Sequence, residues 1–349
     1  MLHEEMGDAT RVTLSSIAEQ AAVSLPTVSK VLNGRGDVAP ATRARVEALL
    51  ATNGYSKRGD AAASAPLIEL VFHELDSAWA IEVIRGVERV ARANGMSIIL
   101  TESGDRHSPG VGWIDGVLQR NPAGVILIFS DLSADYKQQL ATRNIPFVVV
   151  DPAGDPAPDV PSIGSANWSG GFAATQHLVS LGHTRIGMIS GPDEMMCSRA
   201  RVGGYRAALE AAGIAFDPTL VVEGDFHPEG GQRRAMELLQ RSERPSAIFS
   251  GSDLQAMGVY EAARTLGLSI PADLSVVGYD DLPVARWVGP PLTTVRQPLT
   301  EMAEEAAKLV LQLRKEPQLE NRRMDLATSL VVRQSTAPLP AGAATAEPA

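Results

Sequence analysis

Short apolar runs rich in β-branched residues alternate with amphipathic stretches between residues 67 and 335, and this alternation constrains the fold more than any other feature. In a first series, strands are expected at 67–72, 97–101, 124–129 and 147–151, and helices at 82–93, 112–119 and 134–142. In a second series, helices are expected at 171–181, 200–212, 230–240 and 253–266, and strands at 185–190, 220–223, 247–250, 275–279, 293–295 and 328–332. Strand followed by helix, repeated, is typical of parallel sheets covered on both faces, so two series predict two α/β lobes.

The body lies between two segments that have few large apolar side chains. Residues 59–66, Gly-Asp-Ala-Ala-Ala-Ser-Ala-Pro, are expected to form a hinge or linker. Residues 336–349, mostly Pro, Ala and Gly, are expected to be a disordered tail. The chain is therefore divided into a head (1–58), the hinge, a body (67–335) and the tail.

The charge is distributed unevenly between head and body. Residues 9 to 58 contain seven basic and three acidic residues, a net charge of +4, whereas the whole chain carries −10. A small basic head on an acidic body suggests a head that binds a polyanion such as DNA. An ordinary fluctuation of surface charge is the alternative.

Other features of the chain exclude whole classes of protein. No apolar run reaches the length of a membrane span, and Glu4, Glu5 and Asp8 stand where a secretory signal carries basic residues, so a cytoplasmic location is expected. A single cysteine, Cys197, rules out an internal disulfide, and the six histidines show no tight ligand spacing, so neither metal nor other cofactor is expected. Nucleotide-binding and hydrolase motifs are missing, so an enzyme is not expected.

The head is expected to consist of three helices. Apolar side chains spaced by three and four positions predict a short first helix, which Thr13 can cap: Leu14, Ile17, Ala18 and Ala21. After a tight connection, a second helix at 26–32 turns Val28, Val31 and Leu32 inward, and a third follows at 42–53. Two short helices joined by so small a turn match the helix-turn-helix plan, although any small three-helix domain could show this spacing.

Several motifs then occur in order along nearly the whole chain. The head carries Val12-Thr13-Leu14-x-x-Ile17-Ala18-x-x-Ala21-x-Val23-Ser24-x-x-Thr27-Val28-Ser29-x-Val31-Leu32-Asn33, Thr42-Arg43-x-x-Val46 and Gly54-Tyr55. The body carries Leu181-Gly182-His183-x-x-Ile186, Ser250-Gly251-Ser252-Asp253-x-x-Ala256-x-Gly258, Pro271-x-Asp273-Leu274-Ser275-Val276-Val277-Gly278-Tyr279-Asp280-Asp281 and Pro291-Leu292-Thr293-Thr294-Val295. Together these motifs resemble the lac/gal repressor (LacI-type) family of bacterial transcription regulators.

The resemblance implies an architecture and partners. It implies a two-lobed, periplasmic-binding-protein-like (type I) body with three crossings between lobes, an N-lobe of about 67–166 and 297–326 and a C-lobe of about 167–296 and 327–335. It also implies a small-molecule site in the cleft, and homodimers that bind double-stranded operator DNA. A tetramer is disfavoured because the tail lacks an apolar heptad.

The resemblance also assigns residues of the head to DNA. Hydroxyl, amide and phenol side chains match positions that contact phosphates in the family: Thr13, Ser24, Thr27, Ser29, Asn33, Thr42 and Tyr55. Leu25, Pro26 and Lys30 match the base-reading positions, where Lys30 can donate to guanine and the other two offer apolar contact. Helix caps and a solvated lysine are the structural alternatives.

The hinge departs from the family pattern. Family members commonly place a leucine here that wedges into the minor groove. This chain has Asp60 and a run of alanines and is about three residues shorter, so a leucine wedge cannot form. Whether so short a segment becomes helical on DNA is left open.

The cleft residues follow from the same resemblance. Arg201 and Asp280 match recurrent effector contacts, and their donors and acceptors suit a polyhydroxylated ligand. Asp253 and Arg199 are assigned to the site as contacts or as supports of contacts. Among the scarce aromatic residues, Phe72, Trp79 and Phe226 are expected to wall the cleft, with core packing as the alternative.

The sequence therefore predicts a DNA-binding transcriptional regulator, with repression controlled by a sugar or oligosaccharide. The alternatives are a cytosolic solute-binding protein and a regulator that responds to another ligand such as a nucleobase. The identity of the effector, the operator sequence and the choice between induction and corepression stay open, because linkage allows either sign.

Overall fold

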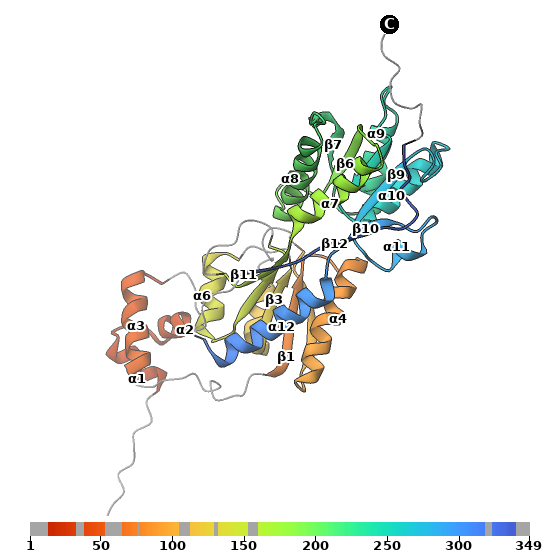
Figure 1. The fold of residues 1–349 in the computed structure, drawn as a ribbon. Coiled ribbons are helices and arrows are strands. Elements are labelled where there is room, and N and C mark those ends of the chain that lie inside the picture. Colours follow the sequence, from red (N-terminus) through yellow and green to blue (C-terminus); the bar gives the residue numbers. More distant parts are fainter. Residues whose placement is uncertain are drawn as a thin grey trace, which may run out of the picture.

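The structure is a computed structural model, which describes residues 13–32, 38–52, 65–75, 77–104, 112–128, 132–152, 160–317 and 323–339. A small helical head and two α/β lobes follow one another along the molecule (Figure 1). Most of the hinge and the last ten residues lie outside the described residues, as do two candidate DNA contacts, Asn33 and Tyr55.

The head contains the three expected helices, α1 (Leu14–Gln20), α2 (Leu25–Leu32) and α3 (Pro40–Thr52). Thr13 caps α1, as the sequence predicts, and Ser16 completes a capping box with it. The inward faces of the three helices meet in a small core that includes Ile17, Val28 and Val46, each fully buried.

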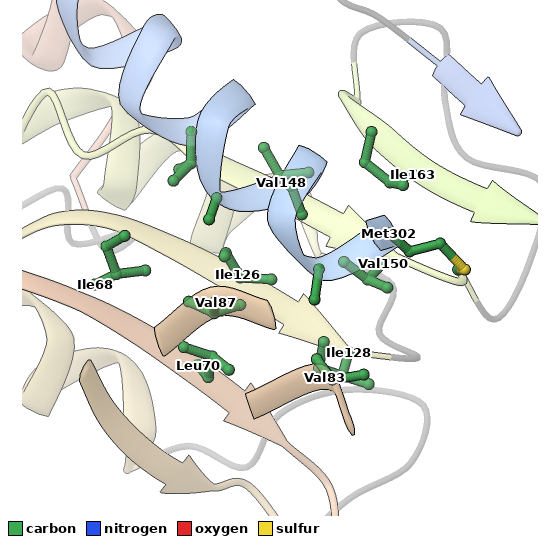
Figure 2. Packing of buried hydrophobic residues seen from close by; sticks show 14 of the residues in the cluster. Ile68, Leu70, Val83, Val87, Ile126, Ile128, Val148, Val150, Ile163 and Met302 are labelled. Carbon is green, nitrogen blue, oxygen red and sulfur yellow. The ribbon is translucent and has the colours of Figure 1, made fainter. Parts of the chain in front are cut away.

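The first lobe is built on a parallel sheet with the strand order β11-β5-β4-β3-β1-β2. Its strands are β1 (Ala65–Phe72), β2 (Ser97–Glu102), β3 (Pro122–Ile128), β4 (Phe147–Val150), β5 (Ser162–Ser165) and β11 (Arg323–Leu326). Helices α4 (Ala78–Ala93) and α12 (Leu299–Lys315) lie side by side on one face (Figures 1 and 2), and α5 (Trp113–Arg120) and α6 (Ala134–Thr142) cover the other. Side chains such as Ile68, Ile126, Val148 and Met302 fill the first interface, so this sheet is buried on both faces.

The second lobe repeats this plan with the strand order β12-β10-β9-β8-β6-β7. Its strands are β6 (Ile186–Ser190), β7 (Val221–Glu223), β8 (Ala247–Ser250), β9 (Ser275–Asp280), β10 (Thr293–Arg296) and β12 (Ser329–Val331), and only β12 runs antiparallel among the described strand pairs. Helices α7 (Asn167–Ser180) and α8 (Met196–Ala211) cover one face, and α9 (Pro228–Leu239) and α10 (Asp253–Thr265) cover the other. Two short helices, η1 (Pro218–Leu220) and α11 (Val284–Trp287), complete it.

The chain crosses between the lobes three times. It crosses after β5, after β10 and after β11, so that α12 and β11 return to the first sheet and β12 joins the second. The two-lobed α/β class is as expected. Strands β5 and β11, the short helix α11 and the long helix α12 were not predicted from the sequence.

The tail prediction is wrong for its first four residues. The Leu339 N–H donates to the Leu181 carbonyl at 2.8 Å, and the Ala337 N–H donates to Ser275 Oγ at 3.0 Å. The buried ring of His183 contacts the Ala337 carbonyl at 3.1 Å. Hydrogen bonds to buried polar groups thus hold 336–339 against the second lobe despite their Pro- and Ala-rich composition.

Candidate functional site

Helix α2 presents one face to solvent. Val28 and Val31 are buried against the other head helices, while Pro26 and Lys30 are exposed and Leu25 is 45% exposed. The three side chains expected to read bases therefore lie on the solvent-exposed face of α2, where a DNA groove could reach them.

Two of the expected phosphate contacts also act as helix caps. Thr13 Oγ1 accepts from the Ser16 N–H, and Ser24 Oγ accepts from the Thr27 N–H, both at 3.3 Å. Ser24 and Thr27 also share a hydroxyl hydrogen bond of 2.9 Å. A hydroxyl that accepts one hydrogen bond still carries its own O–H, so capping does not prevent contact with a phosphate. Ser29 and Thr42 are half-buried.

A cleft lies where the two lobes face each other, with a cavity of about 80 Å³. The first lobe contributes its wall after β1 and β3, and the second lobe contributes loops after β6, β7, β8 and β9. The lining residues are Phe72, His73, Glu74, Ser77, Trp79, Ala80, Ile128, Met195, Cys197, Arg201, Asp225, Phe226, His227, Ser252, Leu254 and Asp280. Carboxyl ends of parallel strands meet here, the usual place for a ligand in an open α/β sheet.

Arg201 occupies the centre of the lobe junction. Its Nε donates to Asn167 Oδ1 at 2.9 Å, its Nη1 to the Gly251 carbonyl at 2.6 Å and its Nη2 to Gln297 Oε1 at 3.2 Å. The guanidinium carbon lies 3.7 Å from the centroid of the Tyr279 ring. Because a guanidinium has five N–H donors, these three hydrogen bonds leave other N–H groups available to a ligand in the cleft. The same bonds also tie together segments on two of the lobe crossings.

The two neighbouring aspartates after β9 have different surroundings. Asp280 lines the cleft, and burial raises the pKa of its carboxyl to about 7 against the opposing effect of Arg201. Asp281 instead forms ion pairs with Arg296 and Arg333 on the second lobe. Both residues have positive φ, 112° and 59°, which turns successive side chains in different directions.

Asp253 and Arg199 do not line the cleft. Asp253 is fully buried, accepts from the Leu282 N–H at 2.7 Å and from the Thr294 hydroxyl at 2.5 Å, and so holds the loop that carries Asp280. Burial and the charge of Asp280 raise the pKa of the Asp253 carboxyl. Arg199 is exposed and donates to the carbonyls of Asp193 and Glu194, because it lies on the solvent side of α8.

The three aromatic candidates all line the cleft. Phe72 and Trp79 are 2% and 8% exposed, and each lines the cleft and also packs in the first lobe's core. Phe226 has a φ of 68°, and a Cβ on Gly191 would lie 1.9 Å from its ring. The ring therefore keeps its place only because residue 191 has no side chain.

Several polar groups of this region were not predicted from the sequence. Gln297 accepts from Arg201 and donates to Asp151 Oδ2 at 3.4 Å, which links the second crossing to the end of β4. At the mouth of the cleft, Glu74 of the first lobe lies 3.9 Å from His227 of the second. Neither pairing leaves a local signal in the sequence, since the partners are far apart along the chain.

No helix in the described part of the protein combines the length and apolar character needed to cross a membrane. Within the same residues, no group of three or more His, Cys, Asp or Glu side chains is arranged to hold a metal ion.

Comparisons with known proteins match both parts of the chain. The family described as bacterial regulatory proteins, lacI family, matches residues 13–57, and the periplasmic binding protein-like domain matches residues 175–336. The HTH-type transcriptional repressor CytR of Escherichia coli (strain K12) is 31% identical over 335 residues, which cover 95% of this chain and 98% of the relative.

Two solved structures extend the likeness to the fold. A complex of the transcriptional regulator CelR with cellobiose is 33% identical, with a TM-score of 0.71, and the match covers 93% of this chain and all of that one (100%). The lac repressor dimer bound to operator and the anti-inducer ONPF is 28% identical, with a TM-score of 0.68, and the match covers 94% of this chain and 100% of the other. These relatives are regulators.

Proposed function

The chain belongs to the lacI family of bacterial regulatory proteins, and from that premise we propose a specific ligand class and specific contact residues for it. It is a ligand-controlled, DNA-binding transcriptional repressor that binds operator DNA as a dimer. Our proposal is that its effector is a neutral sugar or short oligosaccharide held in the cleft, and that the protein works in the cytoplasm without catalysing a reaction.

The cleft chemistry carries this proposal. Arg201 supplies N–H donors, Asp280 supplies carboxylate acceptors, and Phe226 and Trp79 supply aromatic faces, all lining one cavity. A sugar hydroxyl both donates and accepts, and an apolar ring face stacks on an aromatic wall, so these groups leave few polar atoms of a bound sugar unpaired. The CelR relative has cellobiose bound in its structure, which supports the same ligand class.

Arg201 also suggests how ligand binding is transmitted. Its hydrogen bonds reach Asn167 and Gln297, which stand at two of the three crossings between lobes. A ligand that competes for the same guanidinium changes the balance between lobe arrangements by its differential contact energy, and operator affinity shifts by no more than that energy.

On the head, we assign base reading to the exposed face of α2. Lys30 would donate to a guanine edge, with Leu25 and Pro26 in apolar contact, while Thr13, Ser24, Thr27, Ser29 and Thr42 would approach phosphates. A two-fold dimer presents two such helices about one DNA turn apart, so a roughly palindromic site is expected. Footprinting that returned one asymmetric half-site would contradict this arrangement.

A paired binding experiment tests the effector class. Calorimetric titration of the full chain with cellobiose, other neutral sugars, nucleosides and free nucleobases would identify the ligand, and operator titration with and without it would give the sign of control. We expect a neutral sugar to bind and to change operator affinity, with no turnover of the sugar. Binding of a nucleobase and of no sugar would show that the effector is not a sugar. Chemical conversion of the bound sugar would show that the protein is an enzyme.

A further inference from the structure

A second cavity, of about 190 Å³, lies at the junction of the lobes. Both lobes line it, through the end of β4, strand β5 and the first crossing, strand β11, and the beginnings of α7 and α8. Its lining residues are Asp151, Gly164, Ser165, Ala166, Asn167, Trp168, Ser169, Met196, Cys197, Ala200, Arg323 and Asp325. We propose that this junction cavity is a second ligand site, which binds a small neutral polyhydroxylated molecule and adjusts the response of the cleft.

An unpartnered hydroxyl is the first observation that points to a ligand. Ser165 is 6% exposed, and its Oγ has no hydrogen-bond partner within the described part of the protein. A buried hydroxyl without a partner costs free energy, which a ligand oxygen in the cavity would recover.

An aromatic face is the second observation. Trp168 lines the cavity and is 49% exposed, although one side of its indole stacks on Phe172 with ring centroids 5.4 Å apart. A large aromatic ring left half in solvent beside carboxylates and amides is the arrangement expected where the apolar face of a sugar ring stacks.

The polar lining contains both donors and acceptors. Asp151 and Asp325 offer carboxylates, while Arg323 and Asn167 offer N–H groups. Helices α7 and α8 both begin at this cavity, and neither has a side-chain hydrogen bond at its N-cap, so their first N–H groups add further donors.

This mixture favours a neutral ligand over a charged one. The carboxylates of Asp151 and Asp325 repel an anion, whereas Arg323 and the two helix N-termini disfavour a cation. Hydroxyl groups satisfy both kinds of lining group, because each donates one hydrogen bond and accepts others.

The junction cavity is connected to the cleft. Cys197 lines both cavities. Asn167, in the junction cavity, accepts from Arg201, in the cleft, and Asp151 accepts from Gln297, which itself accepts from Arg201. A ligand that engages Asn167 and Asp151 therefore acts on the groups that position Arg201, and coupling between two sites is reciprocal.

The test uses the full chain labelled with ¹⁵N and titrated with D-glucose, D-ribose and cellobiose. The chain has four tryptophans, so Trp168→Phe assigns one indole N–H signal to the junction cavity. We expect a monosaccharide to shift that signal saturably in the parent and equally in Phe226→Ala, which damages only the cleft. Calorimetry should show a second binding event that Phe226→Ala retains.

Ser165→Val provides the specific variant and Ser162→Val its matched control. Ser162 lies on the same strand, is 1% exposed and also has a hydroxyl without a partner among the described residues, but it does not line the cavity. Ser165→Val should weaken monosaccharide binding at the Trp168 signal by roughly three- to tenfold, and Ser162→Val should leave it unchanged.

The outcomes separate this site from the cleft. Loss of the Trp168 shift in Phe226→Ala, equal effects of the two serine variants, or no shift with any of the three sugars would overturn the second site. Cellobiose binding abolished by Phe226→Ala while the Trp168 signal never moves would leave the proposed function standing and remove only the junction site.

Discussion

The head and the cleft place their candidate contact residues in opposite physical settings. Lys30 lies exposed on a short helix, whereas Arg201 is 3% exposed and donates three hydrogen bonds to neighbouring segments. An exposed contact can be removed without disturbing the fold, but a buried one supports the fold and the ligand together. Variants of the cleft therefore need a stability measurement beside every affinity measurement, and variants of the head do not.

The largest expected effect lies in the buried setting. Arg201→Ala should lower the free energy of unfolding by roughly 3 kcal/mol or more, because Asn167, Gly251 and Gln297 lose a donor in a buried region. Thermal melting of the variant, with and without effector, measures this. Arg199→Ala, two residues earlier on the exposed side of α8, is the control and should change stability by no more than about 0.5 kcal/mol. An Arg201→Ala protein that melts like the parent yet ignores the effector would show that ligand contact is its main role.

The second effect lies on the exposed surface of the head. Lys30→Ala should weaken binding to the specific operator by about 1 to 3 kcal/mol and to random DNA much less, with an unchanged melting temperature. Arg45→Ala, an exposed cation on α3, should weaken binding to both DNAs by similar amounts. Quantitative titration at fixed salt compares the variants, and equal losses of Lys30→Ala on both DNAs would assign Lys30 to phosphate.

A third effect is visible only as a dependence on pH. With a pKa of about 7, Asp280 is largely protonated below neutral pH, and a protonated carboxyl accepts less well from sugar hydroxyls. Effector affinity should therefore fall as pH drops below about 7, by at most about tenfold per pH unit. Calorimetry across this range should show a flatter profile for Asp280→Asn, and identical profiles would contradict the assignment.

The free energy of unfolding should depend on pH in the opposite direction from effector affinity. The folded protein holds a proton on Asp280 that the unfolded chain releases near its ordinary pKa of 3.8. The stabilisation from that proton is fully present below the unfolded pKa, and it is lost as the pH rises through about 7. Denaturant titrations of the parent and Asp280→Asn over the same range check this term independently of any ligand.

The smallest effect is expected at the mouth of the cleft. Glu74→Gln removes a partner 3.9 Å from His227, and side chains that are 50% and 32% exposed gain little from such a pair. Effector affinity should change by at most about 1 kcal/mol, less at high salt. Glu88→Gln, whose carboxylate pairs with Arg92 on the same helix, is the control. A change above about tenfold at Glu74 would mean that this mouth pair dominates closure of the cleft.

The head could be predicted well from sequence because its signals are local. The spacing of Leu14, Ile17 and Ala21, together with the Thr13 cap, is contained within ten residues, and each predicted helix begins within two residues of the observed one. In the body, helix α12 was missed although Leu299, Met302, Ala303 and Ala306 repeat at helical spacing. Strands β5 and β11 were missed because they are four residues long and rich in polar residues or glycine.

The cleft could be predicted only in part. Arg201, Asp280 and Phe226 were named because they stand in recognisable motifs, and the structure brings them to one cavity. Gln297 and Asp151 are 146 residues apart, and only the folded crossings bring them together. Contacts of this kind carry no periodicity that a single sequence can reveal.

The first lobe is built from two separate segments of the chain, and this affects how it folds during synthesis on the ribosome. The face of β1, β3 and β4 that α12 covers is translated more than a hundred residues before residues 299–315, with most of the second lobe made in between. During synthesis from the N-terminus, the head can fold early, but the first lobe must wait with Ile126 and Val148 uncovered. A chain whose synthesis stops before residue 299 is therefore expected to have a folded DNA-binding head and an incomplete first lobe with exposed apolar side chains. Chaperones and proteases recognise such exposed apolar surface.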